Sequence, residues 1–297
     1  MQDAVEMLET VSRSVVTVDG RRGYALSGVV YAADTGASAM VVTTSRAVEE
    51  ETAQVGTADG RTLSATLVGR DPATDLAVLK LEGAAEEMGL EPIVWAEMDT
   101  LKVGQTVFRV GRPGDTLRAT KGILGGLGGA WHTRWGGRVD ARLYTDAAAF
   151  RGFSGGPLVT LNGETVGLNT AALNRAGDAV VPSATVRRVV GALLEHGRVR
   201  RGYLGLGGQS VRLPAEIRER SGQRAGLMVV SVEAEGPAAQ AGLVLGDILL
   251  KYGGEAVYRP GHLLAQLDET QVGKALGVEL LRGGEIHALS VTVGERA

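Results

Sequence analysis

The chain of 297 residues has a formal net charge of −3 and no cysteine. This charge excludes the basic footprint of a nucleic-acid-binding protein and a polybasic membrane patch, and the lack of cysteine excludes disulfides. No apolar run reaches a membrane-spanning length, and the first residues lack the basic and apolar regions of a signal peptide. The length favours two domains. The compartment stays open: the chain is cytoplasmic as given, and periplasmic or extracytoplasmic if a leader has been trimmed.

The first part of the chain has the pattern of a β protein. A short helix is expected over residues 3–11, followed from about residue 14 to 182 by many short strands, which indicate a sandwich or one or two barrels. Three Asx-Gly pairs stand between apolar or β-branched runs, the strongest short-range signal for a hairpin. The pairs are Asp19-Gly20, Asp59-Gly60 and Asn162-Gly163.

The periodicity then changes to that of a helix. Apolar residues recur three and four positions apart at Val186, Val189, Val190, Leu193 and Leu194, and Gly197 follows as the expected C-cap. Beyond the basic connector RVRRG lies a second β-rich segment with two helical pieces, PAAQAG and PGHLLAQLDE. We place the boundary near residues 198–202, which gives domains of residues 1–198 and 199–297.

The stretch RGFSGGPLV places Ser154 between glycines at the start of an apolar run. A serine hydroxyl becomes a strong nucleophile only when a base accepts its proton. Gly152 lets the backbone turn so that the amides of Gly152 and Ser154 can together hold an oxyanion. The alternative is a glycine-rich hairpin whose serine caps a turn.

Four stretches in chain order resemble the HtrA (DegP-like) branch of the trypsin-like proteases. SGVVYAADTGASAMVVTTSRAVEE resembles the strand pair that ends in the triad histidine, and DPATDLAVLK the strand with the triad aspartate. LYTDAAAFRGFSGGPLVTLNGETVGLNTAAL resembles the serine segment, and VVPSATVRRVVGALLEHGRVRRGYLGL the entry to a PDZ domain. The resemblance implies a mainly β fold. It has two trypsin-like six-stranded barrels (about residues 14–90 and 91–183), a connecting helix (184–197) and a β-sandwich-like PDZ domain with two helices.

The resemblance makes Ser154 the nucleophile and Asp75 the triad aspartate, but it puts Arg46 where the base histidine belongs. A guanidinium only donates hydrogen bonds and stays protonated, so it cannot accept the serine proton. Its planar fork suits a bidentate pair with Asp75. The sharper alternative is a cation beside Ser154 that holds a peptide carboxylate or carbonyl. Phe153 also departs from the family, which often has Asn or Asp there, and this puts the oxyanion-hole geometry in question.

No histidine is well placed to replace the missing base. The chain has four, in a glycine-rich loop, near the end of the connecting helix and in the second domain, and we expect none of them to be catalytic: His132, His196, His262 and His287. We also expect no metal and no cofactor, because the chain contains neither an HExxH motif nor a phosphate-binding loop.

The resemblance also implies two peptide-binding regions. The floor and wall of a specificity pocket fall on Ala148, Gly167, Leu168 and Asn169, and the lack of charge there favours small or aliphatic side chains. The PDZ carboxylate-binding loop falls on Tyr203, Leu204, Gly205 and Leu206, before a strand that can accept a peptide strand. Leu263 and Leu267 either line the PDZ side-chain pocket or belong to the core.

These features predict an HtrA-like protein that binds unfolded polypeptides or peptide C-termini and is proteolytically inactive or severely impaired. One alternative is an active serine endopeptidase in protein quality control that uses an unforeseen base. Another is a regulatory subunit that joins active relatives in a hetero-oligomer. The resemblance further implies a homo-oligomer, commonly a trimer, and we expect no nucleic-acid partner.

Overall fold

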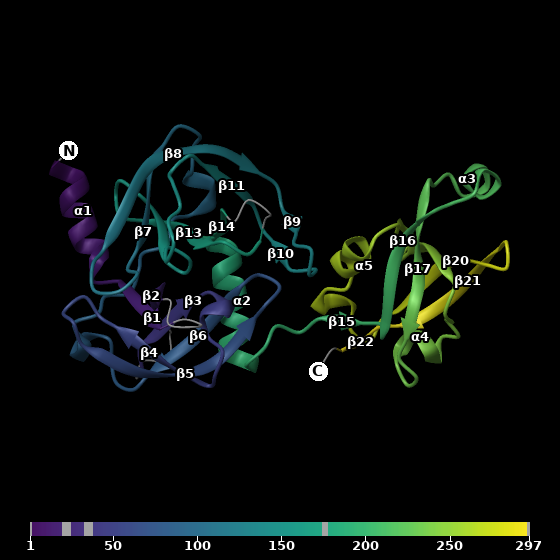
Figure 1. The fold of residues 1–297 in the computed structure, drawn as a ribbon, viewed down its shortest axis with the longest axis horizontal. Coiled ribbons are helices and arrows are strands. Elements are labelled where there is room, and N and C mark those ends of the chain that lie inside the picture. Colours follow the sequence, from purple (N-terminus) through teal and green to yellow (C-terminus); the bar gives the residue numbers. More distant parts are fainter. Residues whose placement is uncertain (1, 20–24, 33–37, 174–177, 296–297) are drawn as a thin grey trace. The chain divides into compact units, whose positions relative to one another are not determined.

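The computed structural model describes residues 2–19, 25–32, 38–173 and 178–295. The chain divides into two compact units (Figure 1), of which the first extends to Val199 without the loop Arg134–Gly137 and the second begins at Arg200. The first unit begins with helix α1 (Gln2–Ser12), one residue longer at each end than predicted. Its apolar side places Met7 and Val11 in a buried cluster with Phe108.

Six antiparallel strands close the first barrel in the order β1-β2-β3-β6-β5-β4. Valine, leucine and alanine side chains from all of these strands fill its interior, as β-branched and aliphatic residues do in pleated sheets. The Asp59-Gly60 pair forms the predicted turn between β4 and β5, with Gly60 at a φ of 85°. The turn predicted at Asp19-Gly20 lies outside the described residues. The strands are β1 (Val15–Asp19), β2 (Ala25–Tyr31), β3 (Met40–Thr43), β4 (Thr52–Gly56), β5 (Thr62–Asp71) and β6 (Leu76–Leu81).

A second six-stranded sheet runs in the order β11-β8-β7-β12-β13-β14 and curls until its edge strands β11 and β14 approach each other. The two predicted barrels are therefore confirmed, one closed and one nearly closed. Asn162-Gly163 forms the predicted turn between β12 and β13. A short ribbon of β9 (Trp131–His132) and β10 (Arg138–Val139) stands beside this sheet. The strands are β7 (Thr106–Gly111), β8 (Arg118–Gly128), β11 (Arg142–Thr145), β12 (Pro157–Thr160), β13 (Thr165–Thr170) and β14 (Ala179–Pro182).

Helix α2 (Ser183–His196) joins the two barrels, because it contacts β5 and β6 of the first and β13 and β14 of the second. Its buried valines and Leu193 share one apolar cluster with residues from both sheets. The helix ends as predicted at Gly197, which has a φ of 72° and donates its amide to the Leu193 carbonyl at 2.8 Å. The two barrels and the loops between their strands are therefore held in a single packed body.

The second unit is built on a sheet in the order β16-β17-β18-β20-β21. The short strand β19 (Glu255–Ala256) pairs with β18. Strands β15 (Gly202–Tyr203) and β22 (Gly294–Glu295) form a separate two-stranded sheet. Its described residues form three α-helices instead of two. The additional helix, α3 (Ala215–Ser221), forms in the polar segment because Ile217 packs into a small buried cluster. The other elements are β16 (Leu206–Arg212), β17 (Ala225–Val232), β18 (Ile248–Tyr252), β20 (Ala275–Arg282), β21 (Glu285–Thr292), α4 (Pro237–Gln240) and α5 (Pro260–Gln266).

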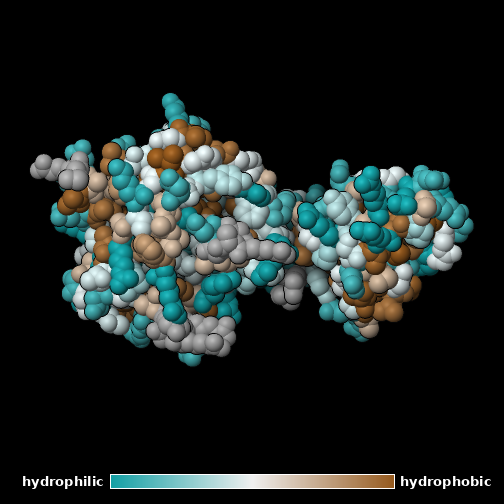
Figure 2. All heavy atoms as spheres, turned by 45° about the horizontal axis from the view of Figure 1, so that its top comes forward, coloured by the Kyte–Doolittle hydropathy of each residue, from teal (hydrophilic) through white to brown (hydrophobic). Residues whose placement is uncertain are grey.

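The surface of each unit mixes polar and apolar side chains, as Figure 2 shows for one face. Apolar side chains such as Ile123, Tyr144 and Phe150 are exposed on the first unit. None of the helices in the described ranges is long and apolar enough to span a membrane.

Candidate functional site

Ser154 lies in the loop between β11 and β12 and is half-buried at the edge of a cavity of about 310 Å³. The cavity is bordered by the turn before the serine, by the end of β13, and by side chains from the first barrel. Its described lining is Leu26, Arg46, Arg109, Ala149, Phe150, Arg151, Gly152, Phe153, Ser154, Asn169, Thr170 and Ala171.

Two glycines give the serine loop its shape. The Phe153 amide donates to the Phe150 carbonyl at 3.1 Å with Gly152 at a φ of 90°, the pattern of a type II turn, which needs a positive φ at its third residue. Gly155 has a φ of 87°, and a Cβ there would stand 1.9 Å from the Ser27 carbonyl oxygen. The Ser27 amide in turn donates to the Ser154 carbonyl at 3.0 Å. The loop is thus fixed against the first barrel.

The same loop leaves two amides facing no partner in the described chain. The amides of Phe153, Gly155 and Gly156 all donate to backbone carbonyls, whereas the structure shows no hydrogen bond from Gly152 or Ser154 to any described residue. Free amides separated by one residue are the arrangement that can receive a developing oxyanion. The assignment of the oxyanion hole to Gly152 and Ser154 stays a prediction.

The Phe153 ring packs into the barrel instead of disturbing the turn. Its side chain is 1% exposed and stands edge-on to Phe150, with ring centroids 5.9 Å apart. Gly111 makes the space, because a Cβ there would approach the Phe153 ring to 2.8 Å. The positive φ of Gly152 is therefore compatible with a bulky residue before the serine.

Asp75 lies between the two barrels, just before β6, and is 3% exposed. It is the one non-glycine residue with a positive φ (57°) in the described ranges, a conformation that costs energy and is often found at functional sites. Thr170 at the end of β13 donates its hydroxyl to Asp75 Oδ2 at 2.6 Å. The Ser45 amide donates to the Asp75 carbonyl at 3.1 Å, which holds the 3-10 turn Ser45–Ala47 beside it.

Arg46 reaches Asp75 from this turn, but not through the expected fork. The shortest ion-pair contact joins Arg46 Nε to Asp75 Oδ1 at 3.6 Å, and the Arg46 backbone amide approaches the same oxygen at 3.4 Å. The guanidinium makes no hydrogen bond to a residue that the structure describes, and its side chain is 51% exposed. The predicted bidentate pair is therefore wrong: the short turn presents the backbone to the carboxylate and leaves the end of the side chain toward solvent.

The electrostatics of Asp75 are dominated by burial. Removal from water raises the pKa of Asp75 above its ordinary value, while the hydrogen bond from Thr170 and the positive charge of Arg46 act in the opposite direction. Since the net direction is upward, the two partners do not fully compensate the cost of a charged carboxylate in this place.

The four predicted pocket residues have separate environments. Asn169 lines the cavity and donates its side-chain amide to the Gly156 and Pro157 carbonyls at 2.9 and 3.0 Å. Leu168 is 1% exposed in the core, and Gly167 packs against the Val181 carbonyl. Ala148 is exposed and is absent from the described lining. Only Asn169 among the four therefore borders the Ser154 cavity.

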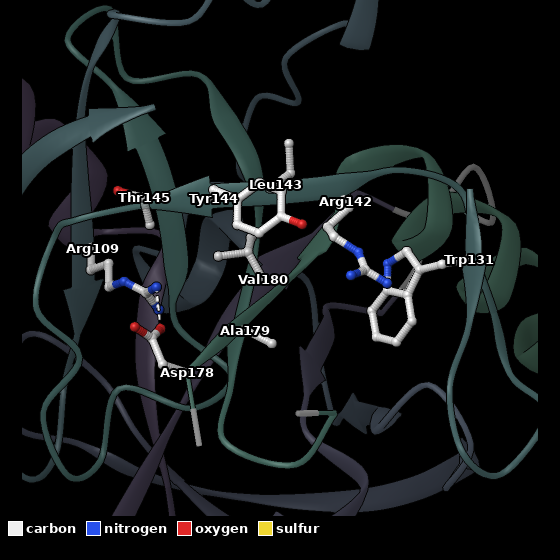
Figure 3. Close-up of a pocket in the computed structure, with 9 residues that line it drawn as sticks. All are labelled: Arg109, Trp131, Arg142, Leu143, Tyr144, Thr145, Asp178, Ala179 and Val180. Carbon is white, nitrogen blue, oxygen red and sulfur yellow. Dashed lines mark ion pairs between the residues drawn. The ribbon is translucent and has the colours of Figure 1, made fainter. Parts of the chain in front are cut away.

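Arg109 is a functional candidate that the sequence interpretation missed. It lies in β7, is 2% exposed, donates from one terminal nitrogen to Asn169 Oδ1 at 3.0 Å, and forms an ion pair with Asp178 through the other. Figure 3 shows this pair in a neighbouring cavity of about 300 Å³, and Arg109 also lines the Ser154 cavity. The expectation of an uncharged pocket is thus wrong. The signal was an arginine inside the apolar strand TVFRVG.

The second unit presents an edge strand beside a glycine loop. Gly205 has a φ of 71°, its carbonyl accepts the Glu233 amide at 2.8 Å, and the Tyr203 hydroxyl donates to the Glu233 carboxylate. Strand β16, which starts at Leu206, is at the end of the described sheet and is packed by α5. Such an edge can accept a peptide strand. Three apolar residues of the predicted site belong to the buried core of this unit: Leu204, Leu263 and Leu267.

The four histidines lie apart from the serine cavity. They are found in β9, at the end of α2, in α5 and in β21, and none belongs to the described lining around Ser154: His132, His196, His262 and His287. Among the described residues no group of three or more histidines and carboxylates is arranged to hold a metal ion.

Comparisons with known proteins agree with this architecture. Residues 26–168 match the family model of the trypsin-like peptidase domain, and residues 202–293 match that of the PDZ domain. The periplasmic serine endoprotease DegP of Escherichia coli (strain K12) is 34% identical over 268 residues, 87% of this chain and 54% of the relative. A probable periplasmic serine protease do/HhoA-like of Haemophilus influenzae is 34% identical over 77% of this chain and 50% of its own length. The chain thus spans about half the length of these curated relatives.

Solved structures match over nearly the whole chain. The serine endoprotease from Yersinia pestis is 29% identical with a TM-score of 0.72, covering 99% of this chain and 98% of that one. The HtrA-type protease AlgW with a tripeptide is 28% identical with a TM-score of 0.70, covering 99% and 97%. The chain is thus similar, in sequence and in structure, to HtrA-type proteases, with a match to a trypsin-like peptidase domain followed by a match to a PDZ domain.

Proposed function

We propose that this protein binds polypeptide on an HtrA-type protease fold and cleaves it slowly or not at all, because Arg46 takes the place of the base histidine. The observation that carries the proposal is the position of Arg46. It lies beside Asp75, which the family resemblance makes the triad aspartate, and it lines the same cavity as Ser154. In the resembled sequence pattern the base histidine belongs at this position.

The chemistry of arginine supports the loss of proteolysis. A guanidinium has no lone pair available to accept the Ser154 proton at neutral pH, and the described lining of the cavity contains no histidine. General-base catalysis contributes about 10²- to 10⁴-fold to such reactions. When a triad member is removed, about 10³- to 10⁴-fold acceleration over water persists from the oxyanion hole and from binding.

Two features support peptide binding. The Ser154 cavity is lined by a fixed glycine turn, and strand β16 offers a sheet edge next to the Gly205 loop. We propose unfolded polypeptides and peptide C-termini as ligands and a homo-oligomer, by resemblance a trimer, as the working form. The curated relatives named above are described as periplasmic, which favours an extracytoplasmic compartment over a cytoplasmic one.

Cleavage of casein by three proteins tests the proposal. Wild type, Ser154→Ala and Arg46→His are compared side by side at equal concentration, with fragments quantified by mass spectrometry. We expect wild type to match Ser154→Ala, and Arg46→His to exceed both by at least about 10²-fold, since a histidine there restores the base to an otherwise formed site.

Two alternatives have their own outcomes. The relatives are named as serine endoproteases, so an active enzyme is the competing function; cleavage by wild type that Ser154→Ala abolishes would establish it and contradict our proposal. A regulatory subunit would be monomeric when purified alone and would assemble only with an active relative, which light scattering distinguishes from a homo-oligomer.

A further inference from the structure

The charges around the Ser154 cavity are of one sign. Three arginines line it, Arg46, Arg109 and Arg151, and its described lining contains no aspartate or glutamate. Two carboxylates outside this lining pair with these arginines: Asp75, whose side chain is 4% exposed, with Arg46, and Asp178, whose side chain is 39% exposed, with Arg109. The charged side chains that line the cavity itself are therefore all guanidinium groups.

Arg109 contributes a largely buried cation to this site. Its two terminal nitrogens contact Asn169 and Asp178, and its Nε is buried with no hydrogen-bond partner in the described chain. Arg109 is 2% exposed, and solvent screens a buried charge only weakly. Its positive charge, which Asp178 partly offsets, therefore acts on the cavity from the wall.

Arg46 brings a cation that is weakly engaged. Its shortest contact to Asp75 is 3.6 Å, its guanidinium donates no hydrogen bond to a described residue, and half of its side chain is exposed. Arginine has five N–H donors in a planar fork that matches the two oxygens of a carboxylate.

We infer that the Ser154 cavity is a carboxylate-binding site that selects polypeptides with an acidic group, with Arg46 and Arg109 as its specificity-determining residues. The inference rests on the proposed function and names the ligand class of that site. It replaces the sequence-based expectation of an aliphatic preference, since the charged side chains in the described lining are all arginines. The volume of about 310 Å³ is at the small end of ligand sites and suits one side chain or one chain terminus.

The carboxylate has two possible sources, an aspartate or glutamate side chain and the C-terminus of a peptide. Four unlabelled decapeptides of alanine and serine separate them. Three are acetylated and amidated and carry a central Glu, Gln or Ile; the fourth carries the central Gln and a free C-terminal carboxylate. Binding to the full chain is measured by isothermal titration calorimetry, and the peptides are checked for cleavage afterwards.

We expect the Glu peptide to bind wild type at least about 10-fold more tightly than the Gln and Ile peptides, because a charge-assisted hydrogen bond is roughly twice as strong as a neutral one. Arg46→Gln and Arg109→Met should each remove most of this difference. Arg13→Gln is the matched control. Arg13 is also an exposed arginine with a carboxylate partner, Glu91, but it lies outside the described cavity lining. This variant should prefer the Glu peptide as strongly as wild type does.

If wild type binds the fourth peptide more tightly than the amidated Gln peptide, and Arg46→Gln abolishes this difference in affinity, the chain terminus is a ligand of the cavity. If Arg46→Gln keeps this difference but loses the preference for Glu, the acidic side chain is the ligand and the terminus binds elsewhere. The inference is overturned if wild type binds the Glu, Gln and Ile peptides equally, or if the Glu preference survives both substitutions. Arg46→Gln keeps the test valid even if the buried Arg109→Met variant does not fold.

This result is independent of proteolysis. Cleaved peptides recovered from the wild-type titration would contradict the proposed lack of activity. The preference for the four peptides could then still be ranked by comparing the rates at which they are cleaved. Uncleaved peptides with no acidic preference would instead contradict the ligand class alone.

Discussion

The two sides of the Ser154 cavity are held in different ways. On the serine side, Gly155 fits against the Ser27 carbonyl with no room for another atom, and backbone hydrogen bonds fix the turn. On the aspartate side, Arg46 makes one 3.6 Å contact and is half exposed. The shape of the first side depends on the packed barrels, whereas the second side depends on a single side chain of a surface turn. If Arg46 takes the place of the base, as we propose, the binding geometry on the serine side does not depend on that change.

The largest effect that tests this contrast is expected from Gly155→Ala. The new Cβ would overlap the Ser27 carbonyl oxygen at 1.9 Å, and the residue needs a φ of 87°. Overpacking and a positive φ each cost about 1–3 kcal/mol, so we expect a loss of about 3 kcal/mol or more in the free energy of unfolding. Urea denaturation followed by tryptophan fluorescence measures it, because Trp95 and Trp131 lie in the first unit.

Gly60→Ala is the control for this change. Gly60 has nearly the same φ, 85°, but nothing within 4 Å of the position of a Cβ. It should therefore show only the backbone cost of about 1–2 kcal/mol. Equal losses at the two glycines would mean that the serine loop is not held by the close approach to Ser27, and that the two sides of the cavity do not differ as described.

Much of the fold follows from local signals in the sequence. Asp59-Gly60 and Asn162-Gly163 predicted turns that the structure contains, because a hairpin turn depends on the φ angles of two residues. The 3.6-residue period and Gly197 predicted α2 and its end for the same local reason. Helix α3 was missed because its segment is polar; it depends on the burial of Ile217 against residues distant in the sequence.

The site was less predictable because it depends on what distant residues do to one another. The resemblance to the family drew attention to Ser154, Asp75 and Arg46. The sequence could not show that Arg46 would offer Asp75 its backbone amide and one nitrogen instead of a fork. The sequence also predicted an uncharged pocket. Arg109 was missed because it belongs to a strand far from the serine in sequence and reaches the cavity only through the pairing of β7 with β12.

A smaller effect is expected from Asp75→Asn, and it has a definite pH dependence. Because burial raises the native pKa of Asp75 above its ordinary value of 3.8, the unfolded chain loses this proton first as the pH rises. Wild type therefore loses stability between pH 3.8 and the raised native pKa, and the loss is complete above that window. The asparagine has no such loss, so the variant should gain stability relative to wild type as the pH rises through this window.

The measurement is the difference in unfolding free energy between Asp75→Asn and wild type from pH 3 to pH 8. We expect this difference to shift in favour of the variant as the pH rises through the window. A shift in favour of wild type would mean that Arg46 and Thr170 more than compensate the burial of the charge. The aspartate side would then be as well satisfied as the serine side.

The smallest effect is expected from Arg46→Gln. Exposed ion pairs contribute about 0–1 kcal/mol because water and salt screen them, and Arg46 is 51% exposed with no hydrogen bond from its guanidinium to the described residues. We expect the free energy of unfolding to change by less than about 0.5 kcal/mol.

Thr170→Val is the matched comparison on the buried side of the same carboxylate. It removes the 2.6 Å hydrogen bond to Oδ2 and should cost about 1–3 kcal/mol, because it leaves a buried acceptor unpaired. If the two substitutions cost the same, Arg46 is a structural partner of Asp75, and the guanidinium is not available to a ligand in the cavity.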